Sequence, residues 1–206
     1  AILLPQQLIQ SARSLPDNRQ EEWQRRKIQN ALNFADVYKT DPRAVVVLAE
    51  AANDLLQQNS YEDAKQIAER VIQWQPAAEG SLLFSSWLIL GHSRFETKEY
   101  AAAEQAYMQV LNLLPVYGKN PGVPSVQQVQ ERIAASIYQQ AEASLTFGDK
   151  DTAIAQLMRI TQLTPNTEIA AKAQYDAATN MTDRQGALMV LCSLECPERE
   201  AALADF

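Results

Sequence analysis

The sequence predicts an all-α fold built from repeated helical hairpins, and three observations support this prediction. Within residues 87–115 the large apolar residues recur three and four positions apart, which is helical spacing. The phase of that pattern changes near residues 96–99, which predicts two amphipathic helices joined by a tight turn. The chain also contains only 6 glycines and is 47% hydrophobic, a composition that favours helices over sheets.

The hairpin at residues 87–115 has counterparts on both sides of it in the chain. Matching small and apolar residues stand at Tyr61, Ala64, Ala68, Val71 and Pro76 before it, and at Gly148, Ala153, Leu157, Ile160 and Pro165 after it. These three matching segments, called frames below, each end in proline at the same distance from the start of their second helix, which indicates an internal repeat. One hairpin cannot bury both of its faces, so the sequence predicts that the hairpins stack on one another.

These residues resemble the tetratricopeptide repeat (TPR) family over about residues 45–165. The second frame carries the family's order of large and small positions, at Trp87, Leu90, Gly91, Tyr100, Ala103, Tyr107 and Pro115. It departs from the pattern at Arg94, which stands where the first aromatic residue is usual. The resemblance implies a right-handed α-α superhelix, a TPR-like solenoid of about three repeats, at residues 45–76, 84–115 and 134–165.

Residues 1–44 are predicted to form N-terminal capping helices, because a stack of repeats needs atypical ends to cover its last apolar face. A short helix is expected over residues 2–14, and a longer one begins with Asp17 or Asn18 as its cap. The apolar positions of the longer helix are Trp23, Ile28, Leu32, Phe34 and Val37. This helix should end near Thr40, because the Asp41-Pro42 pair disfavours helix at Asp41.

Caps and helix breakers predict the boundaries between the repeats. Ser60, with Asp63 three residues on, is predicted to cap the second helix of the first repeat. Pro115 is predicted to stop the second helix of the second repeat. The Gly/Pro-rich residues 116–125 should form an inserted loop, either a tolerated surface insertion or a binding loop. The first helix of the third repeat should extend back to Val126.

Residues 166–206 are predicted to close the stack with a helical pair, over residues 168–179 and 183–194. Within them, residues 174–206 resemble part of the C-terminal helical domain of bacterial aminopeptidase N, through the segments NMTDR and CPEREAALADF. The catalytic domain of that family uses an HExxH zinc motif and a GAMEN segment, and this chain has one histidine and neither motif. The resemblance therefore implies helical-repeat structure rather than peptidase activity.

The sequence offers no pattern typical of catalysis, of a metal site or of a cofactor. His92 and Glu96 are four residues apart and could supply two metal ligands, but no third ligand is evident. No Ser/His/Asp set and no Gly-rich phosphate loop can be assembled from the spacing of the residues. Cys192 and Cys196 are also four residues apart, and free thiols, a disulfide and a metal pair stay open for them.

The charge of the chain argues against a nucleic-acid partner. The net charge of the chain is −7. Residues 1–44 contain seven Lys and Arg, whereas residues 45–206 contain eleven Lys and Arg and twenty Asp and Glu, so this larger part is acidic. The only basic cluster, residues 25–27, is interpreted as a solvated helix face. No apolar run is long enough to span a membrane, which predicts a soluble protein. The cytoplasm and, if a signal peptide has been removed, the bacterial periplasm or envelope both stay open.

The predicted function comes from surface residues. The groove positions of the TPR family fall here on Asn53, Leu56, Gln57, Leu88, His92, Phe95, Glu96, Tyr138, Glu142, Leu145, Lys172 and Asp176. This mixture of acidic, amide and apolar side chains suits a peptide or helix with apolar anchors and some basic or amide groups. Simple solvent exposure of these residues is the alternative interpretation.

We therefore expect a non-catalytic scaffold that binds a protein or peptide partner, with a homodimer through an exposed end helix as a further option. A helical accessory domain of a larger, aminopeptidase-like enzyme is the second hypothesis. A designed or chimeric helical-repeat chain without an evolved partner is the third.

Overall fold

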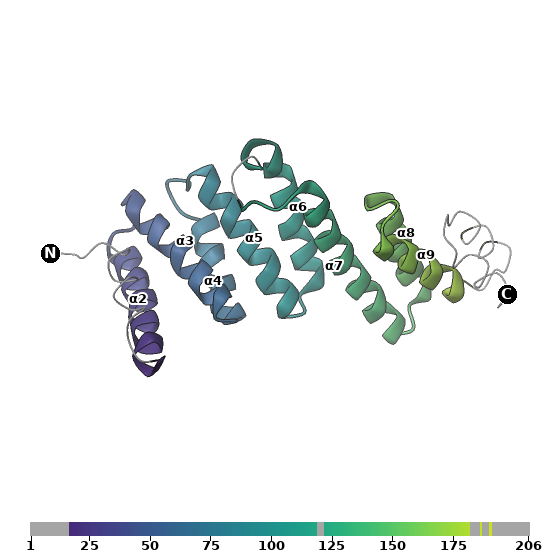
Figure 1. The fold of residues 1–206 in the computed structure, drawn as a ribbon, viewed down its shortest axis with the longest axis horizontal. Coiled ribbons are helices and arrows are strands. Elements are labelled where there is room, and N and C mark those ends of the chain that lie inside the picture. The colour runs from purple at the N-terminus through teal and green to yellow at the C-terminus, as the bar shows by residue number, and fades with distance from the viewer. Residues whose placement is uncertain (1–16, 119–121, 182–185, 187–189, 191–206) are drawn as a thin grey trace. The chain divides into compact units, whose positions relative to one another are not determined.

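The structure is a computed structural model that describes residues 17–118, 122–181, 186 and 190. In this part of the chain all regular structure is helical, which confirms the predicted all-α class (Figure 1). The helices are α2 (Asp17–Val37), α3 (Pro42–Gln57), α4 (Tyr61–Ile72), α5 (Gly80–Glu96), α6 (Tyr100–Tyr117), α7 (Val126–Thr146), α8 (Lys150–Leu163) and α9 (Glu168–Asn180). The helix predicted over residues 2–14, most of the one over 183–194, and both cysteines lie outside the described residues.

The chain divides into two compact units, Ala1–Ser93 and Arg94–Phe206, and the division falls inside α5. In unit 1, α2 packs against α3 and α3 against α4. In unit 2, α6 packs against α7, α7 against α8, and α8 against α9, while α7 also contacts α9. Sequence neighbours are therefore neighbours in space within each unit, as stacked hairpins require. The repeat boundaries within 45–165 stay predictions.

The core of unit 1 is built mostly from small residues, which allow its helices to approach closely. The buried positions of α3 and α4 include Ala44, Leu48, Ala51, Ala52, Ala64, Ala68 and Val71. Asp41 caps α3 by accepting a hydrogen bond from the Arg43 backbone N–H at 2.8 Å, and Pro42 takes the first helical position. Ser60 is the N-cap residue of α4 as predicted, but its side chain makes no capping hydrogen bond.

Helix α2 buries a narrower face than the sequence predicts. Ile28, Ala31 and Ala35 are its buried residues, whereas Trp23 is 40% exposed and Val37 is 72% exposed. Both were predicted to face the core, and this was wrong because spacing alone cannot distinguish the side of an amphipathic helix that meets its neighbour. The helix is held to α3 by an ion pair between Lys27 and Asp54 at 2.5 Å.

The core of unit 2 centres on Tyr107, whose side chain is completely buried. Tyr107, one of the large residues of the family pattern, is thus a core residue, while Tyr100 is only partly buried. The remaining core is small and aliphatic, with Ala103, Val110 and Leu114 from α6, Ile133, Ala134, Ile137 and Ala141 from α7, Ala153, Leu157 and Ile160 from α8, and Ala170, Ala173 and Ala177 from α9. Such burial is the main force that holds these helices together.

The turns inside the three predicted hairpins share one backbone geometry. Asn59, Lys98 and Gly148 have positive φ angles of 58°, 65° and 82° at the same place, two residues before the second helix. In each turn the next backbone N–H reaches back five residues, with Ser60 to Leu55 at 2.9 Å, Glu99 to Arg94 at 2.8 Å and Asp149 to Ser144 at 2.9 Å. This is the Schellman ending of a helix, so the three frames repeat in structure as well as in sequence.

The end of α6 differs from the prediction. Pro115 does not stop the helix, because it lies inside α6, which continues to Tyr117. Proline removes one backbone donor and crowds one carbonyl, and so close to a helix end a single lost hydrogen bond is tolerated. The segment predicted as a loop over residues 116–125 therefore starts inside α6. Helix α7 does begin at Val126, where Ser125 and Gln128 form a capping box.

Candidate functional site

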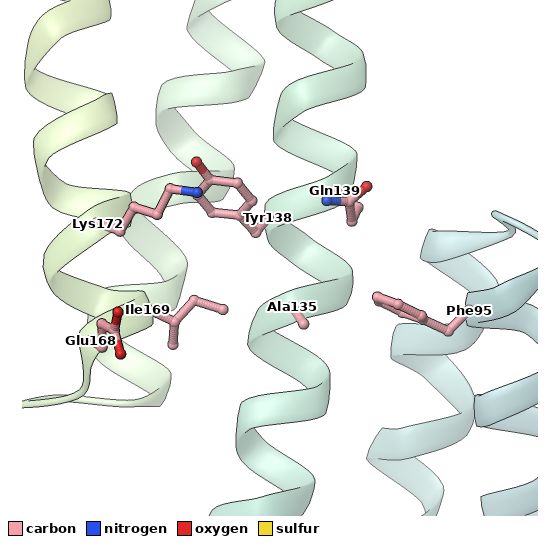
Figure 2. Close-up of a pocket in the computed structure, with 7 residues that line it drawn as sticks. All are labelled: Phe95, Ala135, Tyr138, Gln139, Glu168, Ile169 and Lys172. Atoms are coloured by element: carbon pink, nitrogen blue, oxygen red, sulfur yellow. The ribbon is translucent and has the colours of Figure 1, made fainter.

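Unit 2 contains a pocket of about 320 Å³ between α7, α9 and the last turn of α5 (Figure 2). The residues that line it are Phe95, Ala135, Tyr138, Gln139, Glu168, Ile169 and Lys172. Phe95, Ala135 and Ile169 give it an apolar interior, and the other four lining residues carry polar groups. A pocket of this size lies at the lower end of the range for small-molecule sites, and it is large enough for one or two side chains.

Helical spacing brings these side chains to one surface. On α7, Ala135, Tyr138 and Gln139 are three and four residues apart, so they share one face of the helix. On α9, Glu168, Ile169 and Lys172 do the same. Because α7 contacts α9 directly, the two faces meet, and Figure 2 shows the side chains of both helices around the pocket.

Tyr138 is the most constrained residue of the site. Its hydroxyl donates a hydrogen bond to the Asp176 carboxylate. The Lys172 ammonium nitrogen lies over its ring, 4.6 Å from the centroid. Burial, and then the hydrogen bond to Asp176, raise the pKa of the Tyr138 hydroxyl above its ordinary value, and the negative charge of Glu142 acts in the same direction. Three residues predicted from the sequence, Tyr138, Lys172 and Asp176, are thus brought together.

Phe95 is held in place by its neighbours in unit 2. Its ring packs edge-on against the ring of Tyr100, with 5.4 Å between the centroids and 68° between the planes. The adjacent Arg94 guanidinium donates a hydrogen bond to the Ala102 carbonyl on α6 at 3.3 Å. The last turn of α5 is therefore fixed to α6, and the Phe95 ring is positioned before any ligand arrives.

The surroundings of the pocket are acidic. Glu142 is exposed on α7, one turn beyond Tyr138, and accepts a hydrogen bond from Gln139 at 2.8 Å. Glu168 and Asp176 stand on α9, and Glu96 is exposed at the end of α5. Lys172 is the single basic side chain among the pocket residues. The site therefore combines an apolar interior with an acidic rim.

The other predicted groove residues do not line this pocket. Leu145 is half-buried on α7, beyond Glu142. Five belong to unit 1, where Asn53 and Gln57 are exposed and Leu56, Leu88 and His92 are half-buried. Their role in partner binding stays a prediction.

Sequence reasoning missed Ala135, Gln139, Glu168 and Ile169, although the sequence contained the information to find them. Ala135, Glu168 and Ile169 each stand three or four residues from Tyr138 or Lys172 on the same helix, and so on the same face, and Gln139 stands four residues from Ala135. The family pattern specifies one or two positions per helix, whereas a pocket forms where whole faces of two helices meet.

In the described part of the chain, no three or more histidine, cysteine, aspartate or glutamate side chains come together as a candidate metal site. Among the described helices, none is both long enough and apolar enough to cross a membrane.

Comparison with known families gives two matches to helical repeats. Residues 84–116 match the tetratricopeptide repeat family, and this segment covers most of α5 and almost all of α6. Residues 125–206 match a family described as a domain of unknown function (DUF3458_C) with ARM repeats, a segment that begins at the cap of α7. No curated protein matches the chain. Both matches agree with the resemblances seen in the sequence, and the chain therefore has a helical-repeat fold in which residues 84–116 are similar to a tetratricopeptide repeat.

Proposed function

We propose that this protein is a scaffold for protein–protein interaction, and that the pocket of unit 2 holds an apolar side chain of a bound peptide or helix. The observation that carries the proposal is the apolar interior that Phe95, Ala135 and Ile169 give to this pocket. Burial of one leucine-sized side chain there would contribute about 1.5–3 kcal/mol, a typical value for an anchor residue of a peptide.

The position of the pocket in the repeat supports this proposal. Its residues come from α5, α7 and α9, which are alternate helices, and α5 opens the segment that matches the tetratricopeptide repeat family. Tetratricopeptide repeats typically bind protein partners. The surface formed by the alternate helices of a hairpin stack is exposed along its length, so an extended peptide or a helix can lie across it.

A selection from a random peptide library tests this proposal. The wild-type chain is the bait, and the Ala135→Trp variant, in which an indole fills the pocket, is the counter-selection. The enriched peptides should share an apolar residue and should bind the Ala135→Trp variant about tenfold or more weakly, the equivalent of about 1.4 kcal/mol.

The matched control is Ala155→Trp, because Ala155 is exposed on α8 and does not line the pocket. This variant should bind the peptides as the wild type does, and far-UV circular dichroism should show that both variants fold. If no peptide depends on the open pocket, the proposal is wrong, and a chain without an evolved partner becomes the better account.

A second candidate function is that of a helical accessory domain in a larger enzyme. The match of residues 125–206 to the ARM-repeat family favours it, because that match covers α7, α8 and α9, two of which line the pocket. An aminopeptidase catalytic domain that carries the HExxH motif, mixed with the purified chain, separates the two candidates. Binding of the chain to that domain, with a change in its turnover of amino-acid amides, would favour the accessory domain over the scaffold.

A further inference from the structure

The starting observation is that a cation of the chain itself lies on the aromatic wall of the pocket. Lys172 places its ammonium nitrogen 4.6 Å from the centroid of the Tyr138 ring. A cation over an aromatic face is attracted by the negative charge density of the ring. Figure 2 shows the Lys172 side chain extended from α9 toward Tyr138, along one side of the pocket.

Two carboxylates act on the hydroxyl of the same tyrosine. Asp176 accepts the hydrogen bond from the Tyr138 hydroxyl, and the negative charge of Glu142 acts on the same hydroxyl. The aromatic face and both carboxylates favour a positive charge at this position. Lys172 supplies that charge in the unbound chain.

The contact that Lys172 makes is one that it can leave at low cost. Lys172 is exposed, and no ion pair to a carboxylate of the described residues fixes its ammonium group. Its flexible stem allows the ammonium to swing into water. An arginine of a ligand is better suited to this position, because its planar guanidinium can stack on a ring and donate two hydrogen bonds to carboxylates at once.

We propose that Tyr138, Asp176 and Glu142 form a cation subsite next to the apolar pocket. Lys172 occupies this subsite until a basic side chain of the partner displaces it. The partner segment is thus a peptide in which an apolar residue, for the pocket, stands next to arginine or lysine, for the subsite. This inference rests on the proposed function, since the apolar residue occupies the same pocket.

The test uses two probes, N-acetyl-leucyl-arginine amide and N-acetyl-leucyl-norleucine amide, which differ in charge but have similar length. Binding to the full chain is followed by chemical-shift changes of backbone amides, in the wild type and in Lys172→Met. Loss of the competing ammonium should tighten binding of the arginine probe by about three- to tenfold. The norleucine probe, which takes no part in the competition, should bind both proteins about equally.

Two control variants separate displacement from a general effect of charge. Lys172→Arg keeps a cation over Tyr138 and should show no gain. Lys150→Met makes the same change in net charge at the start of α8, outside the pocket, and should also show none.

The outcomes distinguish this inference from the proposed function. The cation subsite is wrong, and the apolar pocket stands, if Lys172→Met binds the norleucine probe as tightly as the arginine probe. The same conclusion holds if Lys172→Met binds the arginine probe no more tightly than the wild type does. If neither probe shifts any amide of the pocket in any variant, the proposed function is wrong as well.

Discussion

Two tyrosines of unit 2 show how the surroundings of a side chain decide its role. Tyr107 lies entirely within the core, and its burial raises the pKa of its hydroxyl. Tyr138 lies at the pocket, where burial is reinforced by the hydrogen bond to Asp176. The first tyrosine is part of the core, and we propose that the second presents an aromatic face to a ligand. On this proposal the same residue type serves stability in one place and recognition in another.

The raised pKa of Tyr107 predicts that the protein loses stability in alkali. The unfolded chain releases this proton near pH 10, whereas the folded chain retains it, so the free energy of unfolding falls as the pH rises above about 10. One such group contributes a slope of up to about 1.4 kcal/mol per pH unit. Urea unfolding of the wild type and Tyr107→Phe at several pH values, followed by circular dichroism, measures this pH dependence of the free energy of unfolding.

The variant should lose less stability than the wild type between about pH 9 and pH 11, because phenylalanine cannot ionise. The comparison of the two proteins near pH 7 is the control, since it isolates the loss of the hydroxyl from its ionisation. If the free energies of unfolding of the two proteins fall in parallel across the alkaline range, the Tyr107 hydroxyl is not the cause of the alkaline loss of stability.

At the scale of the element, the hairpin turns are the most regular feature of the chain. Asn59, Lys98 and Gly148 all adopt a left-handed backbone, although only Gly148 is the residue type that does so freely. Asparagine tolerates this conformation better than most residues, and lysine does not. The chain therefore accepts local strain at Lys98 to keep the geometry that its neighbouring hairpins use.

Substitutions in two turns should change stability in opposite directions. Lys98→Gly should raise the free energy of unfolding by about 1 kcal/mol, because it relieves the strained φ angle. Gly148→Ala should lower it by about 1–2 kcal/mol. This cost is purely conformational, because a Cβ built on Gly148 meets no atom within 4 Å. Urea midpoints measure both changes, and a neutral Gly148→Ala would show that the turn is not left-handed in solution.

The sequence was informative about elements and less so about their ends and faces. The hairpins were predictable because apolar periodicity and helix breakers recur in several frames, and α7 begins at Val126, the residue to which the sequence extended this helix. Pro115 did not end α6 as predicted, because a proline inside the last turn of a helix costs little free energy. Ser60 is the N-cap residue of α4, but its side chain does not accept the predicted hydrogen bond from an N–H group of that helix. At the site, the family pattern predicted Phe95, Tyr138 and Lys172, but the pocket also needs Ala135 and Ile169. Those two become visible only once α7 and α9 are known to touch.

At the scale of the whole molecule, the chain forms two compact units, each with a core of its own. In unit 2, Glu104 on α6 links three helices, because it accepts hydrogen bonds from Gln140 on α7 at 2.8 Å and Arg159 on α8 at 2.5 Å. Its side chain is only 14% exposed, so these contacts are partly shielded from water. Repeat proteins owe their stability to interactions between neighbouring repeats, so the loss of the Glu104 hydrogen bonds should destabilise mainly the helices that they join.

Hydrogen exchange of Glu104→Ala tests how far such a change spreads. Backbone amides of α6, α7 and α8 should exchange faster in the variant, since opening of this part of unit 2 costs less free energy. Amides of α3 and α4, which belong to unit 1, should exchange at the rate of the wild type. An equal increase in both units would show that they unfold as one cooperative block.

The central claim is that the pocket between α7 and α9 holds an apolar side chain of a partner, and nuclear Overhauser effects test it most directly. A peptide enriched on the wild-type chain is bound to protein labelled at its isoleucine methyl groups. The account predicts contacts between the anchor side chain of the peptide and Ile169, which lines the pocket, and none to Ile160, which is fully buried in the core. A tightly bound peptide whose side chains contact other surface methyls but never Ile169 would contradict the account.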